Sequence, residues 1–192
     1  MSIVVNCTLE RHASAILEFF NEAILTSAVP YGRKPRGPKS MARWFDSKTK
    51  GGFPIIGLED EQGKLLAFGS YGAFRAWPAY KYSVEHSVYV HTNYRGKGLG
   101  KVVMQELIAA ARTKNVHCMI GGFDATNAGS VALHKGLGFV DLGTIKQVAF
   151  KSGKWLDLSF YQLLLTLPSE PVAPALPAFT APGVIRGPAV GP

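Results

Sequence analysis

One short stretch of the chain has the residue types and spacing of an anion-binding turn, and it reads Arg95-Gly96-Lys97-Gly98-Leu99-Gly100. Glycine has no Cβ atom, so a ligand can approach the backbone closely at these positions. The stretch connects a predicted strand to a predicted helix, whose first amides point outwards in a positive dipole field. Arg95 and Lys97 add full positive charges. We therefore expect this turn to bind a pyrophosphate.

Two other phosphate-binding motifs do not fit this stretch. A P-loop has four residues between its glycines and then Lys followed by Ser or Thr, whereas Val102 follows Gly100-Lys101. The dinucleotide fingerprint Gly-x-Gly-x-x-Gly would need the third glycine one position later, and the stretch lies mid-chain after several strands. An ordinary glycine-rich turn remains the structural alternative. The preceding strand and the basic pair favour the phosphate site.

The elements that must position this turn alternate along the chain. Alternating or continuous apolar runs predict strands at residues 2–7, 53–58, 64–74, 82–90, 117–123, 139–150 and 155–165. Helical periodicity predicts helices at residues 12–25, 38–45, 98–112 and 127–137. In the first helix, Ile16, Phe19, Phe20 and Ala23 form one apolar stripe, and Gly138 ends the last helix. This order indicates an α/β fold around a mixed sheet.

Composition narrows the class of protein. Apolar residues make up 47% and charged residues 18% of the 192 residues, which is typical of a soluble globular domain. The longest apolar runs are too short to cross a bilayer, and residues 1–11 do not resemble a secretory signal. We therefore expect a cytoplasmic protein that does not bind membranes. The two cysteines, Cys7 and Cys118, lack metal-ligand spacing and are expected to be buried free thiols.

The net charge of +8 is compatible with more than one kind of partner. Basic residues are scattered, and the densest run, at residues 33–36, is short and has no repeated aromatic partners. A nucleic-acid-binding face is usually continuous, and a positive surface suits an anionic small molecule equally well. The net charge alone does not distinguish a nucleic-acid partner from an anionic small molecule. We expect no nucleic-acid partner.

The end of the chain changes in composition at residue 168. Residues 168–192 contain seven prolines and only two charged residues. Such a segment cannot pair as a strand or continue a helix, so we expect a flexible or polyproline-like tail. The predicted domain is residues 1–167.

The glycine stretch also resembles a known family signature. Arg95-x-x-Gly98-x-Gly100 is similar to the Arg/Gln-x-x-Gly-x-Gly/Ala signature of the GNAT superfamily of N-acetyltransferases. Three further motifs resemble its phosphinothricin acetyltransferase branch, which includes the methionine sulfoximine and methionine sulfone acetyltransferases: Arg75-Ala76-Trp77, Glu85-His86-Ser87 and Lys151-x-Gly153-x-Trp155-x-Asp157. The resemblance covers residues 2–167. It implies a mostly antiparallel mixed sheet flanked by helices, acetyl-CoA as acetyl donor, no metal and a homodimer.

Within this resemblance, two residues are candidates for proton transfer. Glu85 is the implied general base, acting on the acceptor ammonium directly or through a water, and apolar Val84 and Val88 beside it favour a raised pKa. The alternative is a surface carboxylate. His134 stands where many members of the superfamily carry a tyrosine that protonates the leaving thiolate, so it is the candidate general acid. The alternative is a partly exposed helix histidine.

The resemblance assigns further residues to the two ligands. The cofactor set extends from the turn (Arg95, Gly96, Lys97, Gly98, Leu99, Gly100 and Lys101) to the strand residues Val88, Tyr89 and Val90 and to Asn127 and Ser130. The strand residues would offer backbone groups to the pantetheine arm at an edge interrupted by a bulge, while Asn127 would also cap its helix. The acceptor set is Arg75, Ala76, Trp77, Glu85, His86 and Ser87, in which a guanidinium suits a carboxylate. A packed aromatic loop is the alternative, and we expect His86 to be a packed imidazole rather than a second base.

The resemblance implies an enzyme that transfers acetyl to the primary amine of a small amino-acid analogue by direct attack in a ternary complex. Phosphinothricin, methionine sulfoximine and methionine sulfone are the acceptors that the resemblance implies. The alternatives are acetylation of another amine, such as a protein N-terminus, and a non-catalytic module that binds CoA or uses the basic surface. Glu85 beside an intact glycine turn favours the enzyme.

Overall fold

The computed structural model describes residues 2–26 and 35–165, and the predicted tail at 168–192 lies outside them. The strands are β1 (Ile3–Asn6), β2 (Ile55–Glu59), β3 (Leu65–Ala73), β4 (Ser83–Val90), β5 (Cys118–Asp124), β6 (Val140–Lys151) and β7 (Lys154–Leu164). The helices are α1 (Leu9–Thr26), α2 (Lys39–Lys50), α3 (Leu99–Thr113) and α4 (Ala128–Gly136), with short 3-10 turns η1 (Pro78–Tyr80) and η2 (Thr92–Tyr94). The strands and α-helices follow one another in the predicted order.

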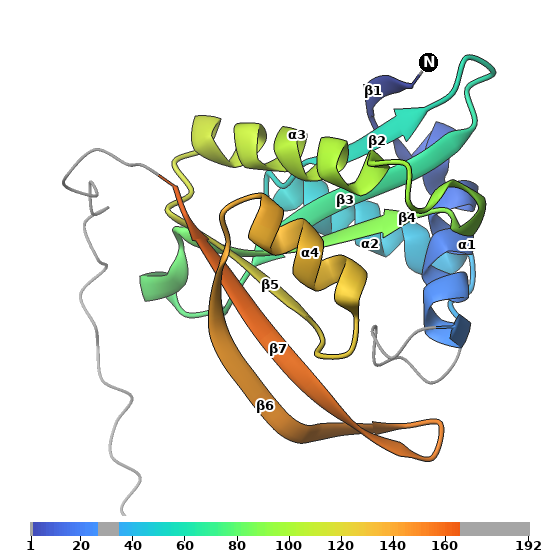
Figure 1. The fold of residues 1–192 in the computed structure, drawn as a ribbon. Helices are drawn as coiled ribbons and strands as arrows, with labels where there is room; N and C mark the ends of the chain where they lie inside the picture. The colour runs from blue at the N-terminus through green and yellow to red at the C-terminus, as the bar shows by residue number, and fades with distance from the viewer. Residues whose placement is uncertain (1, 27–34, 166–192) are drawn as a thin grey trace, which may run out of the picture.

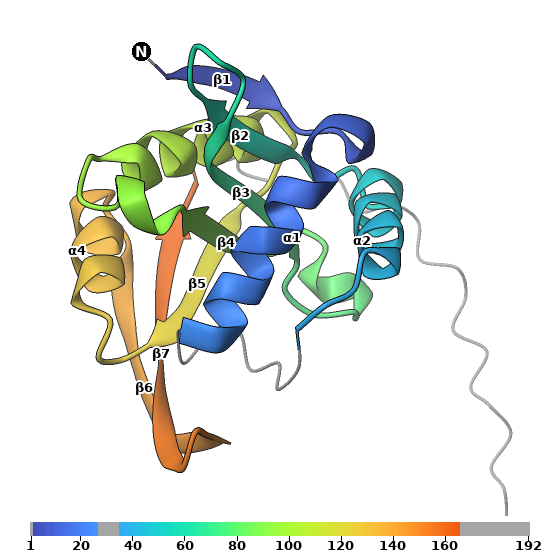
Figure 2. The same ribbon diagram turned by 90° about the vertical axis from the view of Figure 1, so that its right-hand side faces the viewer.

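The strands form one sheet in the order β1-β2-β3-β4-β5-β7-β6. All neighbouring pairs are antiparallel except β4 and β5, which are parallel. Helices α3 and α4 lie against one face of the sheet, and α1 and α2 lie against the other (Figure 1, Figure 2). The predicted mixed, mostly antiparallel α/β fold is confirmed.

Each face of the sheet has its own apolar core. On one face, the predicted stripe of α1 is buried together with Phe45 of α2 and Phe68 of β3. On the other face, α3 buries Val103, Leu107 and Ala111 at four-residue steps against the strands. The sheet therefore separates two layers, and a side chain on a central strand belongs to one layer or the other.

Helix α2 is longer than the sequence predicted. The apolar pattern supports residues 38–45, and Met41 and Phe45 are the residues that α2 buries. The helix continues to Lys50 through polar residues, with an ion pair of 2.7 Å between Lys50 and Asp46 one turn apart. A solvent-facing helical turn of this kind leaves no apolar signal in the sequence.

Strands β4 and β5 separate soon after they meet. They pair at only three registers, Ser83↔Cys118, Val84↔Met119 and Glu85↔Ile120. The register of β4 against β3 runs without a shift from Ala73↔Val84 to Ala67↔Val90. The predicted bulge is therefore wrong, and the edge of β4 beyond Glu85 is opened because its neighbour strand diverges.

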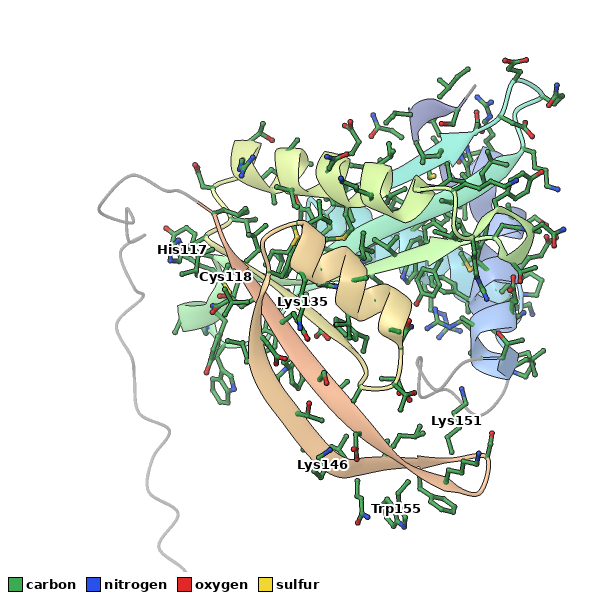
Figure 3. The ribbon with its side chains drawn as sticks, viewed as in Figure 1. His117, Cys118, Lys135, Lys146, Lys151 and Trp155 are labelled. Carbon is green, nitrogen blue, oxygen red and sulfur yellow. The ribbon has the colours of Figure 1, made fainter. Side chains whose placement is uncertain are left out.

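Strands β6 and β7 form a long hairpin that extends beyond the helices (Figure 1). Its register shifts between Ile145 and Ala149. Asp157 of β7 holds this bulge by accepting hydrogen bonds from the Gln147 amide and the Lys146 ammonium, both at 2.9 Å. At the hairpin tip, Lys151 and Trp155 extend to opposite sides (Figure 3).

Candidate active site

The predicted phosphate-binding turn, residues 95–100, is here named the cofactor turn. Gly96 and Gly98 have φ angles of 75° and 79°, a conformation that favours glycine. A Cβ added at either position would have no heavy atom within 4 Å. Among the described residues, the backbone amides of residues 96–100 donate to no backbone carbonyl. Open space in front of unpaired amides at the start of α3 fits a phosphate group.

The basic residues of the turn have different surroundings. The Arg95 guanidinium is paired with Glu22 of α1 at 2.9 Å and donates to the Val90 carbonyl at 3.2 Å. Arg95 therefore ties the turn to α1 and to the end of β4. Lys97 lies 5.0 Å from the centre of the Tyr94 ring, and both Lys97 and Lys101 are exposed. These two lysines present their charges to solvent beside the open amides.

Glu85 lies at the last residue pair that joins β4 to β5. Val84 and Val88 pack into the core beneath α3, so Glu85 points to the opposite face, the one that carries α1 and α2. Its side chain is half-buried. Burial raises the pKa of the Glu85 carboxyl above its ordinary value, and the positive charge of Arg75 partly opposes that shift. A raised pKa makes this carboxylate a stronger base than an ordinary glutamate, which is what a general base needs.

Two consecutive glycines of β5 make room for side chains on both faces. A Cβ at Gly122 would lie 3.1 Å from Glu85 Oε1 and 3.2 Å from the Phe160 ring. A Cβ at Gly121 would lie 2.5 Å from His134 Nε2 and 2.8 Å from His86 Nε2. The pair Gly121-Gly122 thus allows a carboxylate on one face and two imidazoles on the other to approach the same point of the strand.

The predicted acceptor residues are only partly brought together. Arg75 is close enough to Glu85 for its positive charge to lower the pKa of that carboxyl. The Arg75 guanidinium lies 4.1 Å from the centre of the Phe74 ring. Ala76 and Trp77 lie on the exposed segment before η1, where Trp77 is 74% exposed. Ser87 shares the face of Glu85, as alternate residues of a strand do.

His86 does not lie with Glu85. It points to the α3 and α4 face, where it is buried and its Nε2 lies 3.0 Å from Nε2 of the buried His134. His134 Nδ1 lies 2.6 Å from the Ser130 carbonyl. Burial lowers the pKa of His86 to about 3 and also lowers the pKa of His134. Since both ring nitrogens of His134 have partners, the general-acid role predicted for it would require the bond to His86 to break.

Helix α4 begins as the sequence predicted. The Asn127 side chain accepts a hydrogen bond from the Ser130 amide at 3.0 Å, which is a helix N-cap. Val88, Tyr89 and Val90 lie on the part of β4 that has no pairing with β5 in the described residues. The free edge of β4 thus precedes the cofactor turn in the chain, and Gly100 of the turn would carry a Cβ 3.5 Å from Val90 and 3.7 Å from Leu133 of α4.

Sequence reasoning missed the roles of Gly121, Gly122 and Phe160. Glycine inside a strand is unfavourable and often marks a close approach, so the dipeptide in residues 118–124 was a usable signal. Phe160 gave none, because one more apolar residue in a β7 strand predicts only packing. Its position beside Glu85 depends on the pairing Gly122↔Phe160, which is a property of the sheet.

None of the helices in the described residues has the length and apolar character needed to cross a membrane. In residues 2–26 and 35–165, no three His, Cys, Asp or Glu side chains gather in a way that could hold a metal ion.

Comparisons with known proteins agree with this geometry. Residues 19–139 match the family model of the acetyltransferase (GNAT) family. The L-amino acid N-acyltransferase MnaT of Escherichia coli (strain K12) is 38% identical over 160 residues, which cover 83% of this chain and 92% of that protein. The L-methionine sulfoximine/L-methionine sulfone acetyltransferase of Pseudomonas paraeruginosa is 39% identical over 150 residues, with coverage of 78% and 87%.

Solved structures give the same result. A candidate acetyltransferase from Acinetobacter baylyi ADP1 has a TM-score of 0.87 and 53% identity, and the match covers 89% of this chain and 96% of that one. The GNAT superfamily phosphinothricin acetyltransferase of Sinorhizobium meliloti, solved in complex with acetyl-CoA, has a TM-score of 0.84 and 32% identity, with coverage of 90% and 96%.

Proposed function

The chain belongs to the GNAT family of acetyltransferases, and from that membership we propose that it acetylates the primary amine of a small amino-acid-like compound. Phosphinothricin, L-methionine sulfoximine and L-methionine sulfone are the proposed acceptors, since two of these compounds appear in the name of a relative and the third in that of a structural neighbour. The observation that carries the proposal is Glu85, a half-buried carboxylate with a raised pKa at the point where β4 and β5 separate.

Acetyl-CoA is the proposed donor and supplies the acetyl group as a thioester. The cofactor turn would hold its pyrophosphate, because Gly96 and Gly98 leave open space before unpaired amides. The remaining proposed contacts are Leu99, Gly100 and the charges of Arg95, Lys97 and Lys101. The free edge of Val88, Tyr89 and Val90 and the start of α4 at Asn127 and Ser130 would receive the pantetheine arm.

Glu85 is the proposed general base. The acceptor enters as an ammonium, and Glu85 takes one of its protons, directly or through a water, so that the amine can attack in a ternary complex. The face of the sheet that carries Glu85 also carries the Ser87 side chain and the opening left by Gly122. The general-acid role of His134 stays a prediction.

Arg75 is the proposed anchor for the acceptor. The Arg75 guanidinium is close enough to lower the pKa of Glu85 by its charge. An amino acid could therefore place its amine at Glu85 and its carboxylate at the guanidinium. Ala76 and Trp77, on the same segment, would border the acceptor. Lys48 of α2 is a second cation on this side of the sheet. Gly72 of β3 is the residue opposite Glu85, and a Cβ built on Gly72 would lie 3.3 Å from the Lys48 ammonium.

A homodimer in the cytoplasm is proposed as well. Val140 and Ile145 of β6 and Leu164 of β7 share one face of the hairpin by register, and they are 64%, 49% and 60% exposed. Exposed apolar patches on a folded domain mark interaction sites. Light scattering should give twice the mass of the chain, and Leu164→Lys should reduce it; a monomeric wild type would contradict the proposal.

The deciding experiment is a thiol-release assay with acetyl-CoA and a panel of amines. We expect release with L-methionine sulfone, L-methionine sulfoximine or phosphinothricin and none with peptides. Release with an N-terminal peptide alone would support the alternative acceptor. CoA binding without release on any amine would support a binding module.

A further inference from the structure

The histidine pair, His86 and His134, is positioned where β4 and β5 stop pairing. His86 is the residue directly after the last β4–β5 register, Glu85↔Ile120. Its side chain crosses to α4 and meets His134, with ring centres 5.0 Å apart and ring planes at 25°. A side-chain hydrogen bond thus connects β4 to α4 at the place where backbone pairing between the strands ends.

The partners of the pair determine where its protons lie. The Ser130 carbonyl can only accept, so His134 Nδ1 carries a proton and donates it at 2.6 Å. A neutral imidazole has one N–H, so His134 Nε2 is an acceptor, and His86 must donate to it from its own Nε2. His86 Nδ1 is then bare, and it is buried without a hydrogen-bond partner among the described residues.

The surroundings of the pair keep it neutral. Phe123 and Phe139 pack on His134 with ring centres 4.4 Å and 5.0 Å away. Tyr161 of β7 is the titratable neighbour on that side, and its hydroxyl donates to Asp141 at 3.0 Å rather than to the pair. Glu85 lies on the opposite face of the sheet. Within residues 2–26 and 35–165, neither imidazole therefore faces a carboxylate that would stabilise a positive charge.

We propose that His86 is a positioning residue: through His134 and the Ser130 carbonyl, it fixes the first turn of α4 relative to the strand that carries Glu85. This inference rests on the proposed function, in which the start of α4 binds the donor and Glu85 of β4 acts on the acceptor. The pair acts as a neutral, proton-ordered link between the two substrate sites.

Nitrogen-15 NMR of the histidine side chains of the full chain tests the link without any ligand. We expect His134 to be protonated at Nδ1 and His86 at Nε2, with neither ring titrating between pH 5 and 8. The opposite tautomers, or an ordinary titration near pH 6.5 in either ring, would overturn the proposal. The result is independent of whether the protein binds CoA, so it separates this inference from the proposed function.

Three variants then test the consequence for the reaction. His86→Leu removes the donor and should weaken CoA binding in calorimetry about tenfold and lower kcat. His86→Gln keeps an N–H near the Nε2 position and should restore both to within about threefold. Val84→Ala, in the same strand and core, is the control for general destabilisation and should leave CoA affinity unchanged. Wild-type affinity and turnover in His86→Leu, or equal losses in Val84→Ala, would overturn the proposal.

Discussion

A carboxylate and a pair of imidazoles lie on opposite faces of β5 at the same point of the strand, and they differ in whether they can exchange protons with a substrate. On one face, Glu85 is half-buried beside Gly122, and its pKa is raised by burial and opposed by Arg75. On the other face, His86 and His134 are buried against Gly121, bonded to one another and held neutral. The sheet thus separates a group that can exchange protons with a substrate from a pair whose protons are held in hydrogen bonds as long as His86 and His134 stay bonded to each other.

The largest expected effect comes from removing the exchangeable proton site. Glu85→Gln keeps the shape of the side chain but cannot accept a proton, so kcat should fall about 10²- to 10⁴-fold. Since the cofactor turn lies at the other end of β4, the affinity for CoA in calorimetry should stay at the wild-type value. Glu10→Gln, on the exposed side of α1, is the matched control. An unchanged rate in Glu85→Gln would remove this residue from its proposed role.

The sequence predicted only part of this difference between the two faces of the sheet. The glycine turn, the N-cap at Asn127 and the apolar stripe of α1 are local signals, because each depends on residues within one or two turns of the chain. They predicted the order of the elements and the place of the cofactor turn. Glu85 came from a family resemblance, and its half-buried setting depends on Gly122 and Phe160, which are brought beside it by strand pairing.

The histidine pair and the open strand edge were not predictable for the same reason. His86 and His134 are 48 residues apart, and no local pattern states that one will accept a hydrogen bond from the other. The alternation of a strand does place His86 opposite to Glu85, yet the family motif Glu85-His86-Ser87 suggested a shared site. The point where β4 and β5 stop pairing is likewise a feature of the folded sheet that no local sequence pattern states.

A methyl group on the histidine side of β5 should destabilise the fold. In Gly121→Ala, the new carbon would lie 2.5 Å and 2.8 Å from nitrogens of two buried, hydrogen-bonded rings, so at least one ring would have to shift. Overpacking of this kind costs about 2 kcal/mol of unfolding free energy. Urea unfolding followed by circular dichroism measures it, and a midpoint equal to that of the wild type would contradict the close packing.

The same change one residue later should act on turnover instead. In Gly122→Ala, the new carbon would lie 3.1 Å from the end of the Glu85 carboxylate and 3.2 Å from the Phe160 ring, contacts that shifts of a few tenths of an ångström relieve. We expect the urea midpoint to change little and kcat to fall about tenfold, because small displacements of a reacting group slow catalysis. If Gly121→Ala and Gly122→Ala gave the same stability and the same rate, the two faces would not differ as described.

The smallest effect is a pH dependence whose sign differs between the two faces. Glu85 has a raised pKa in the fold, so its contribution to stability is present below the unfolded value and lost as pH rises through the folded one. His86 has a pKa lowered from 6.5 to about 3, so its contribution to stability is complete above pH 6.5 and lost as pH falls.

Between pH 7.5 and 5.5 the loss of the His86 contribution amounts to about 1 kcal/mol. The difference in unfolding free energy between the wild type and His86→Gln should therefore shrink by that amount over this interval, as measured by urea unfolding at each pH. A constant difference would mean that the imidazole takes up its proton equally in the folded and unfolded chains, and the neutral state assigned to that face of the sheet would be wrong.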